Sequence, residues 1–246
     1  MYLENIVIDA VDPQRVGRFW QAAVGGEQLT DEPGIFETRL SIDDGPVLDL
    51  CVQQVPEPPA DPLRLHFDLL GGARQAETVD RLLRLGARHL DLGQGDVGWV
   101  VLADPEGNPF CVMEDRDAYV RTGPIAALPL DAADVDIDAA FWSWLTGWID
   151  RGGIDRGDDG PRILRHPSGR GPLLALCPEP EAKVSGVKNR IHLDVRLQAG
   201  DDPDQVAAGI VERGGHELQH PDWGEQPWRF YTDPSGNDLC VLPACF

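Results

Sequence analysis

The stretch Asp104-Pro105-Glu106-Gly107-Asn108 decides how this 246-residue chain is organised, because it returns later as Asp233-Pro234-Ser235-Gly236-Asn237. A cysteine stands three residues after each stretch, at Cys111 and at Cys240. Proline fixes φ and glycine permits a positive φ, so each stretch predicts a tight turn. A repeated motif of this length calls for a search for further repeats.

Three further anchors precede the motif and recur in the same order: Phe19-Trp20 with Phe141-Trp142, Arg64–Asp68 with Arg190–Asp194, and Trp99 with Trp228. The members of these pairs lie 122, 126 and 129 positions apart, so the copies differ only by small insertions. A short linker around Gly123-Pro124 interrupts the pattern. The sequence therefore predicts two domains of one kind, residues 1–118 and 125–246.

Hydrophobic periodicity predicts the elements of the first copy. Asn5–Ala10 alternates like a half-buried strand, and Asp12-Pro13 then opens a helix that Gly25-Gly26 stops. A second helix is predicted over about 74–85, with Gly86 as its C-cap. The other predicted strands are Ile35–Ser41, Val47–Gln53, Leu63–Leu69, Arg88–Leu92, Trp99–Ala103 and Pro109–Glu114. The predicted fold class is α+β, with a strand-helix-strand-strand-strand unit twice in each copy.

Strand alternation places a histidine, an aspartate and a cysteine on one polar face in each copy, because residues i and i+2 point the same way. An imidazole beside a carboxylate can move protons, so the candidate catalytic residues are His66, Asp68, His192 and Asp194. The candidate ligand-binding residues are Trp99, Cys111, Trp228 and Cys240. The structural alternative is that the tryptophans are core aromatics and the cysteines are small core fillers.

These motifs resemble the glyoxalase, bleomycin-resistance and extradiol-dioxygenase superfamily, also called vicinal oxygen chelate or VOC. The resemblance is carried by Phe-Trp in the first helix, the apolar-His-apolar-Asp strand, and Asp104–Cys111, which is similar to the closing motif of the glyoxalase-like branch. It covers nearly the whole chain, once per half. It implies tandem VOC domains, each of paired βαβββ units whose sheets curl around a cleft, and it names no single reaction.

The resemblance also implies where a metal would bind, because metal-dependent members carry ligands on the first, fourth, fifth and eighth strands. The matching positions are Asn5, Asp49, His66 and Cys111 in the first copy, and Ala127, Ala175, His192 and Cys240 in the second. The first copy could thus hold one divalent metal, zinc or iron, on Asp49, His66 and Cys111. The second copy supplies too few ligands.

Charge and composition narrow the partners. The chain has 42 acidic against 21 basic residues, a net charge of −21, which disfavours nucleic acid and anionic membrane surfaces. The sequence has no apolar run long enough to span a membrane, and its start does not resemble a signal peptide, so we expect a cytoplasmic protein. The expected partner is a small-molecule ligand or substrate, bound by a monomer or a homodimer.

Two functions follow from these features. The favoured hypothesis is a binding protein of the sequestration or resistance type, without a complete metal site, in which tryptophans stack on the ligand; Trp148 and Trp223 are further stacking candidates. The alternative is an enzyme in the first copy, a metal-dependent isomerase, lyase or dioxygenase. A metal-free variant of the enzyme would use a histidine and its neighbouring aspartate as acid and base.

Overall fold

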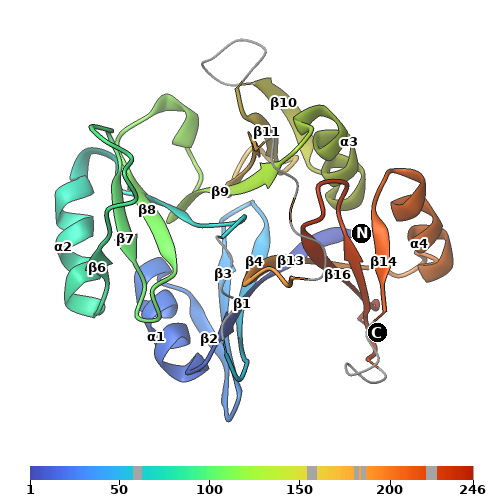
Figure 1. Ribbon diagram of the computed structural model, residues 1–246, viewed down its shortest axis with the longest axis horizontal. Helices are drawn as coiled ribbons and strands as arrows, with labels where there is room; N and C mark the ends of the chain where they lie inside the picture. The colour runs from blue at the N-terminus through green and yellow to red at the C-terminus, as the bar shows by residue number, and fades with distance from the viewer. Residues whose placement is uncertain (58–62, 154–159, 180–182, 184–186, 220–225, 246) are drawn as a thin grey trace.

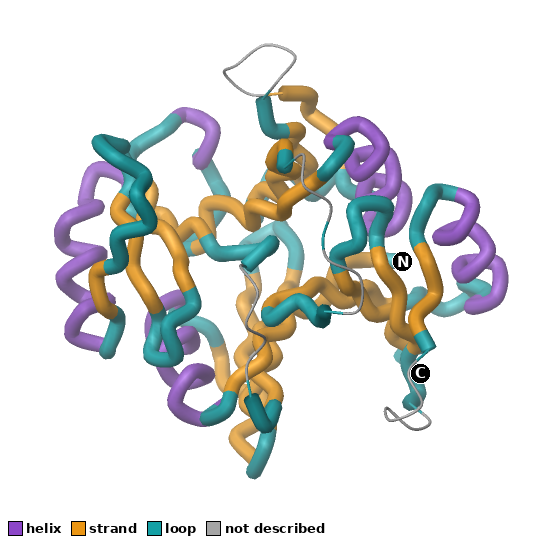
Figure 2. The backbone as a smooth tube through the Cα atoms, viewed as in Figure 1, coloured by secondary structure: helices purple, strands orange, loops and turns teal. Residues whose placement is uncertain are grey.

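The computed structural model describes residues 1–57, 63–153, 160–179, 183, 187–219 and 226–245. Within these residues the strands form two mixed sheets of eight strands each, which we name sheet A and sheet B. The helices lie towards the outside of the molecule and the strands towards its middle (Figures 1 and 2). In the part of the chain so described, no helix is long and apolar enough to cross a membrane.

The elements of the two sheets follow in their spatial order. Sheet A contains β14 (His216–Leu218), β15 (Arg229–Thr232), β16 (Asp238–Leu242), β13 (Ile191–Arg196), β1 (Tyr2–Ala10), β4 (Val47–Gln54), β3 (Ile35–Ser41) and β2 (Glu27–Glu32). Sheet B contains β10 (Ile149–Gly153), β11 (Arg162–Arg165), β12 (Leu173–Pro178), β9 (Ile125–Ala132), β5 (Asp68–Leu70), β8 (Pro109–Met113), β7 (Val100–Ala103) and β6 (Arg88–His89). The helices are α1 (Pro13–Val24), α2 (Gln75–Leu85), α3 (Val135–Thr146) and α4 (Pro203–Glu212), with short 3-10 helices η1 (Gly72–Arg74) and η2 (Asp117–Tyr119).

Each sheet combines one βαβββ unit from each sequence copy. In sheet A the first unit of copy one meets the second unit of copy two, where β1 pairs antiparallel with β13. In sheet B the second unit of copy one meets the first unit of copy two, where β5 pairs antiparallel with β9. The predicted α+β fold class is confirmed. The sharing of each sheet between the copies was not predicted.

Helix α1 shows how the sequence builds these units. The side chain of Asp12 accepts a hydrogen bond from the backbone N of Arg15 at 3.1 Å, and Pro13 occupies the first turn. Gly25 ends the helix with φ of +76°, a conformation that glycine adopts at little cost. The buried face of the helix packs in the main core through Val16, Phe19, Trp20 and Ala23.

The repeated sequence motifs bond to one another in a buried network. Trp20 Nε1 and Asn108 Nδ2 both donate to Asp104 Oδ2, at 3.2 and 2.8 Å. Asn108 Oδ1 in turn accepts a hydrogen bond from Arg190 Nη1 of the other copy at 2.7 Å. The asparagine therefore joins the turn of copy one to the strand of copy two.

The second network repeats the first with the copies exchanged. Trp142 Nε1 and Asn237 Nδ2 donate to Asp233 Oδ2 at 3.1 and 2.9 Å, and Arg64 Nε donates to Asn237 Oδ1 at 3.0 Å. Both arginines stand two positions before a histidine of the polar faces. The recurrence of the motifs thus has one physical cause, a cross-copy connection that is built twice.

Several strands differ from their predictions, and β6 covers only Arg88–His89 of the predicted Arg88–Leu92. β2 was not predicted, because its sequence Glu-Gln-Leu-Thr-Asp-Glu is mostly exposed and has no apolar alternation. Of the predicted strand Leu63–Leu69 only Asp68 and Leu69 lie in β5, and Leu65 is joined to Leu130 by an isolated bridge. His66 therefore stands just outside a regular strand, and His192 stands inside one.

Candidate functional site

A His–Asp–Cys cluster lies on the polar face of sheet A, where β13 and β16 run parallel. We name His192, Asp194 and Cys240 the A cluster; one ligand atom from each lies within 4.8 Å of the others. His192 Nε2 lies 3.4 Å from Asp194 Oδ1 and 3.7 Å from Cys240 Sγ. Asn5 Nδ2, from β1 of the other copy, donates to Asp194 Oδ2 at 3.2 Å. Both copies thus contribute to this cluster.

Burial controls the charge of the A cluster. Desolvation lowers the pKa of His192 to about 3, with a smaller contribution from Lys188, and it raises the pKa of Asp194 to about 7. Desolvation also raises the pKa of the Cys240 thiol well above its ordinary value. At neutral pH the histidine and the thiol are therefore uncharged, and the thiol is no nucleophile in this state.

A cavity of about 590 Å³ opens onto the A cluster. Its walls come from both copies: β1, β3 and β4 on one side, and β13, β15 and β16 on the other. Trp228 and Phe230 stand in the wall, with ring centroids 6.4 Å apart and ring planes at 70°. A cavity of this volume with aromatic walls and a few polar groups is typical of small-molecule sites.

Sheet B carries the equivalent B cluster, made of His66, Asp68 and Cys111, whose ligand atoms also lie within 4.8 Å of one another. His66 Nε2 lies 3.5 Å from Asp68 Oδ1. The histidine side chain is 33% exposed, against 4% for His192 in the A cluster. Burial, followed by the charge of Asp68, raises the pKa of the Cys111 thiol.

Apolar side chains surround the B cluster, whereas the A cluster has polar neighbours. Cys111 and Trp99 pack against a buried cluster that contains Ala127, Ala175 and Tyr119. Tyr119 is only 8% exposed, and burial raises the pKa of its phenol to about 12. The segment after β8 therefore places an aromatic ring beside the B cluster.

The sequence model of the glyoxalase-like domain family matches residues 5–113 and again residues 127–242. The chain belongs to this family. Each match covers one copy, so the recognised resemblance and the duplication are both confirmed. No curated protein sequence matches the chain significantly.

Solved structures show the same fold over the whole chain. Glyoxalase I from Zea mays matches with a TM-score of 0.66 at 14% identity, over 98% of this chain and 92% of the maize chain. A presumed dioxygenase from Bacillus subtilis matches with a TM-score of 0.59 at 15% identity, over 99% of this chain and 85% of that one. At these identities the likeness establishes the fold and leaves the reaction open.

The structure divides the predicted metal set of this glyoxalase-like protein between two sheets. His66 and Cys111 lie in the B cluster, whereas Asp49 lies on β4 in sheet A. Arg39 Nε and Nη2 hold both carboxylate oxygens of Asp49, at 2.8 and 2.7 Å. The prediction took all three metal ligands from one copy of the sequence. The strands of one copy belong to different sheets, so Asp49 is not part of the cluster that contains His66 and Cys111.

The tryptophans predicted to stack on a ligand have different surroundings. Trp228 lines the cavity of sheet A, and Trp99 is partly buried near the B cluster, with Arg116 Cζ 5.7 Å from its ring centroid. Trp148 is 2% exposed in the main core, and Trp223 lies outside the described residues. Cys51 and Lys188 also line the cavity and were not predicted, because no repeated motif contains them.

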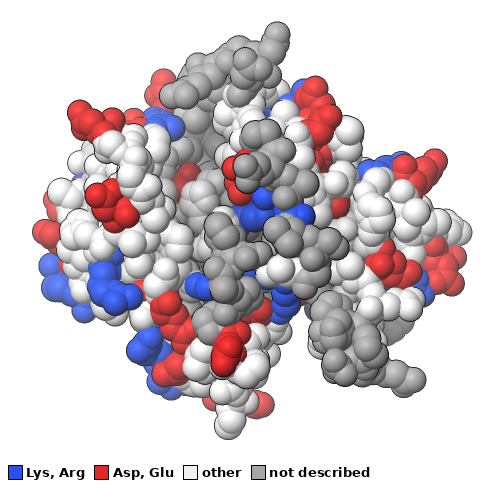
Figure 3. Space-filling model, viewed as in Figure 1, with Lys and Arg blue, Asp and Glu red and all other residues white. Residues whose placement is uncertain are grey.

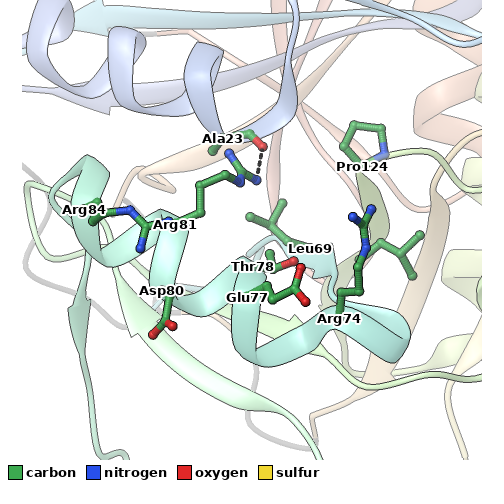
Figure 4. A pocket seen from close by; sticks show the side chains of 10 residues that line it. Ala23, Leu69, Arg74, Glu77, Thr78, Asp80, Arg81, Arg84 and Pro124 are labelled. Atoms are coloured by element: carbon green, nitrogen blue, oxygen red, sulfur yellow. Dashed lines mark hydrogen bonds between the residues drawn. The ribbon is translucent and has the colours of Figure 1, made fainter.

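A second hollow, of about 540 Å³, lies between α1 and α2 of the first glyoxalase-like domain copy (Figure 4). Charged side chains of α2 surround it, among them Arg74, Glu77 and Arg81. Arg81 donates to the carbonyl oxygens of Ala22 and Ala23 at 2.9 and 3.0 Å, and so binds the end of α1. This charged side chain therefore serves to hold α2 against α1. None of the described residues that line the hollow is aromatic, in contrast to the cavity in sheet A.

Proposed function

We propose that this protein binds a small organic molecule in the cavity of sheet A, without a metal ion, as a sequestration or resistance protein does. One observation carries the proposal: the cavity of about 590 Å³ combines an aromatic wall at Trp228 and Phe230 with the buried polar A cluster. Apolar walls give affinity, and a few placed polar groups orient the ligand. Neither role requires a charged or metal-bound centre.

The state of the A cluster supports binding over nucleophilic catalysis. His192 is 4% exposed, and its Nδ1 has no hydrogen-bond partner among the described residues. That nitrogen is fully enclosed, so it does not face a ligand in the cavity. His192 and Cys240 line the cavity in uncharged forms, which suits contact with a ligand more than nucleophilic attack on it.

A tryptophan-quenching screen of aromatic and polycyclic compounds tests this proposal. Ligands that bind should quench Trp228, so Trp228→Phe should lose most of the quenching. Trp99→Phe is the matched control, since Trp99 lies near the other cluster, and it should retain the response. A screen in which no compound quenches, or in which Trp228→Phe quenches like the parent protein, would contradict binding in this cavity.

A metal-dependent isomerase, lyase or dioxygenase is the second candidate function. It is favoured by the nitrogen, oxygen and sulfur donors of the A cluster, which lie within 4.8 Å of one another and match zinc in type and number. His192, Asp194 and Cys240 would hold the ion, which would polarise a carbonyl oxygen of the substrate. Burial opposes this binding, because Cys240 would have to lose its proton.

Metal analysis separates the two functions. Plasma mass spectrometry of untagged protein, before and after incubation with zinc, iron and manganese, should find no stable equivalent if the binding function holds. One equivalent that is lost in His192→Ala and kept in His66→Ala would assign a metal to the A cluster and favour the enzyme.

We further propose a cytoplasmic location and a monomer or homodimer that binds neither nucleic acid nor membranes.

A further inference from the structure

The linker between the two sequence copies turns an aromatic side chain into the body of the protein. The linker arches between β8 and β9, and charged side chains of both signs lie at the surface around this arch (Figures 1 and 3). Asp117 is exposed and Val120 is 58% exposed, whereas Tyr119 between them is 8% exposed. A surface segment can bury an aromatic ring in this way only where a space receives the ring.

The space that receives Tyr119 lies on the face of sheet B that carries the B cluster. The buried apolar neighbours of the ring come from four strands of this sheet: Met113, Ala127, Ile163, Leu173 and Ala175. Cys111 and Trp99 pack against the same group. Burial, followed by the charge of Asp68, raises the pKa of the Tyr119 phenol to about 12, in agreement with a position near this cluster.

Strand register makes this space the counterpart of the cavity in sheet A. Asn5 lies opposite Asp194 in sheet A, as Ala127 lies opposite Asp68 in sheet B. Four further cavity residues have counterparts here: Glu37 and Cys51 match Ile163 and Ala175 through the strand ladders, and Trp228 and Cys240 match Trp99 and Cys111 through the sequence repeat. The ring of Tyr119 therefore stands where sheet A has an open cavity.

The differences between the two linings suit an aromatic occupant. Asn5 and Glu37 of the cavity are replaced by Ala127 and Ile163, which removes an amide and a carboxylate from the wall. The resulting surface is apolar, and an apolar surface is stabilised when an aromatic ring covers it. Sheet B is thus adapted to contain the ring, whereas the same positions of sheet A remain polar.

Two arginines hold the linker over the ring. Arg116 Cζ lies 5.7 Å from the ring centroids of both Trp99 and Tyr119, and its Nε donates to Glu114 Oε1 at 2.6 Å. Arg165 of β11 donates to the carbonyl oxygen of Val120, so the second copy binds the far end of the same segment. The position of the ring is therefore fixed by contacts from both copies.

We propose that Tyr119 is a built-in occupant of the cleft of sheet B, and that this cleft binds an uncharged single-ring phenol when Tyr119 is removed from it. The class of ligand follows from the occupant, because such a phenol presents the same ring to Ala127, Ile163 and Ala175. In the native chain the linker excludes this ligand, so it acts as an autoinhibitory contact on a second site. The inference goes beyond the proposed function, which concerns the cavity of sheet A.

Alkylation of individual cysteines tests the occupancy, because Cys111 packs against the group that surrounds the ring. The rate of reaction with iodoacetamide is measured for each cysteine by peptide mass spectrometry, with and without p-cresol, which is the tyrosine side chain as a free molecule. Without p-cresol, Cys111 should react several-fold faster in Tyr119→Ala than in the parent protein, since thiol reactivity rises with exposure. The rate at Cys240 in sheet A should stay unchanged. Addition of p-cresol should return Cys111 of the variant towards the parent rate.

Tyr119→Phe is the matched control, because it keeps the ring and should react like the parent protein. A rise at every cysteine of Tyr119→Ala would mean an unfolded variant, and Tyr119→Leu, which keeps more of the apolar contact, then takes its place in the same measurement. An unchanged rate at Cys111 in a folded variant, or a fast rate that p-cresol does not slow, would overturn the proposal. Either result leaves ligand quenching at Trp228 untouched, so it is distinguishable from a failure of the proposed function.

Discussion

Replacement of Asp194 by asparagine should stabilise the protein at alkaline pH. The folded protein holds the pKa of Asp194 near 7 by burial, whereas the ordinary value is 3.8. The folded state therefore keeps the proton over a pH range in which the unfolded chain releases it, so stability falls as pH rises from about 4 to about 7. The difference of 3.2 units (7 − 3.8) corresponds, at about 1.4 kcal/mol per unit, to an upper value of about 4 kcal/mol.

Asparagine cannot ionise, and its carbonyl oxygen can still accept the hydrogen bond from Asn5. Urea unfolding of the parent and Asp194→Asn, followed by fluorescence at several pH values from 5.5 to 8.5, measures the difference. We expect a gain of about 2–4 kcal/mol at pH 8.5 that shrinks towards pH 5.5. A difference that does not change with pH, or a variant less stable at pH 8.5, would refute this account of the A cluster.

Asp150→Asn is the control of opposite sign. Burial raises the pKa of Asp150, but the hydrogen bonds from Arg162 outweigh burial and leave the pKa lowered. The stability from this carboxylate is present above its unfolded pKa and is lost only in acid. The control variant should therefore be less stable than the parent by an amount that stays constant from pH 5.5 to 8.5.

Three further substitutions test the fold and the second cluster. Asn108→Ala removes the acceptor of Arg190 and a donor to buried Asp104, so urea unfolding should show a loss of about 2–3 kcal/mol; an unchanged midpoint would contradict a stabilising cross-copy bond. Gly17→Ala should lower the melting temperature, with a loss of about 1–3 kcal/mol, because an added Cβ would lie 2.3 Å from the ring of Phe36; a higher melting temperature would show that the ring moves freely. Tyr119→Ala should open space beside the B cluster and raise the binding stoichiometry of p-cresol; an unchanged stoichiometry would show that Tyr119 does not occupy a second site.

The features that depend on local sequence pattern, such as helix ends and strand faces, were predicted from the sequence. Helix α1 begins and ends at the predicted Asp12 and Gly25, because capping residues act within one turn of the helix. The assembly of the His–Asp–Cys clusters was also predictable, since alternation fixes which side chains share a face of a strand. In β13 this pattern places the ring of His192 beside Asp194 without reference to any other part of the chain.

The pairing of β1 with β13 could not be predicted in this way. Alternation is the same whether a strand pairs within its own copy or with the other, so both arrangements bury the same apolar residues. The hydrogen bond from Arg190 to Asn108 could not be predicted from the sequence for a related reason. Asparagine in a turn motif is explained by local conformation, and its partner across the chain leaves no periodic signal. As a result the ligand set Asp49, His66 and Cys111 was grouped by copy and not by sheet.

The shared sheets give a physical reason for the difference between the two clusters. Each cluster takes its histidine from one copy and its neighbouring first-strand residue from the other, Asn5 beside Asp194 and Ala127 beside Asp68. A substitution in the first unit of one copy therefore changes the surroundings of the histidine in the other copy. It leaves the surroundings of the histidine in the same copy unaltered. The polar Asn5 accompanies an enclosed cluster with a cavity, whereas the small Ala127 packs in the cluster that contains Tyr119. Duplication with exchanged units thus allows the surroundings of the two clusters to differ without a change in either histidine strand.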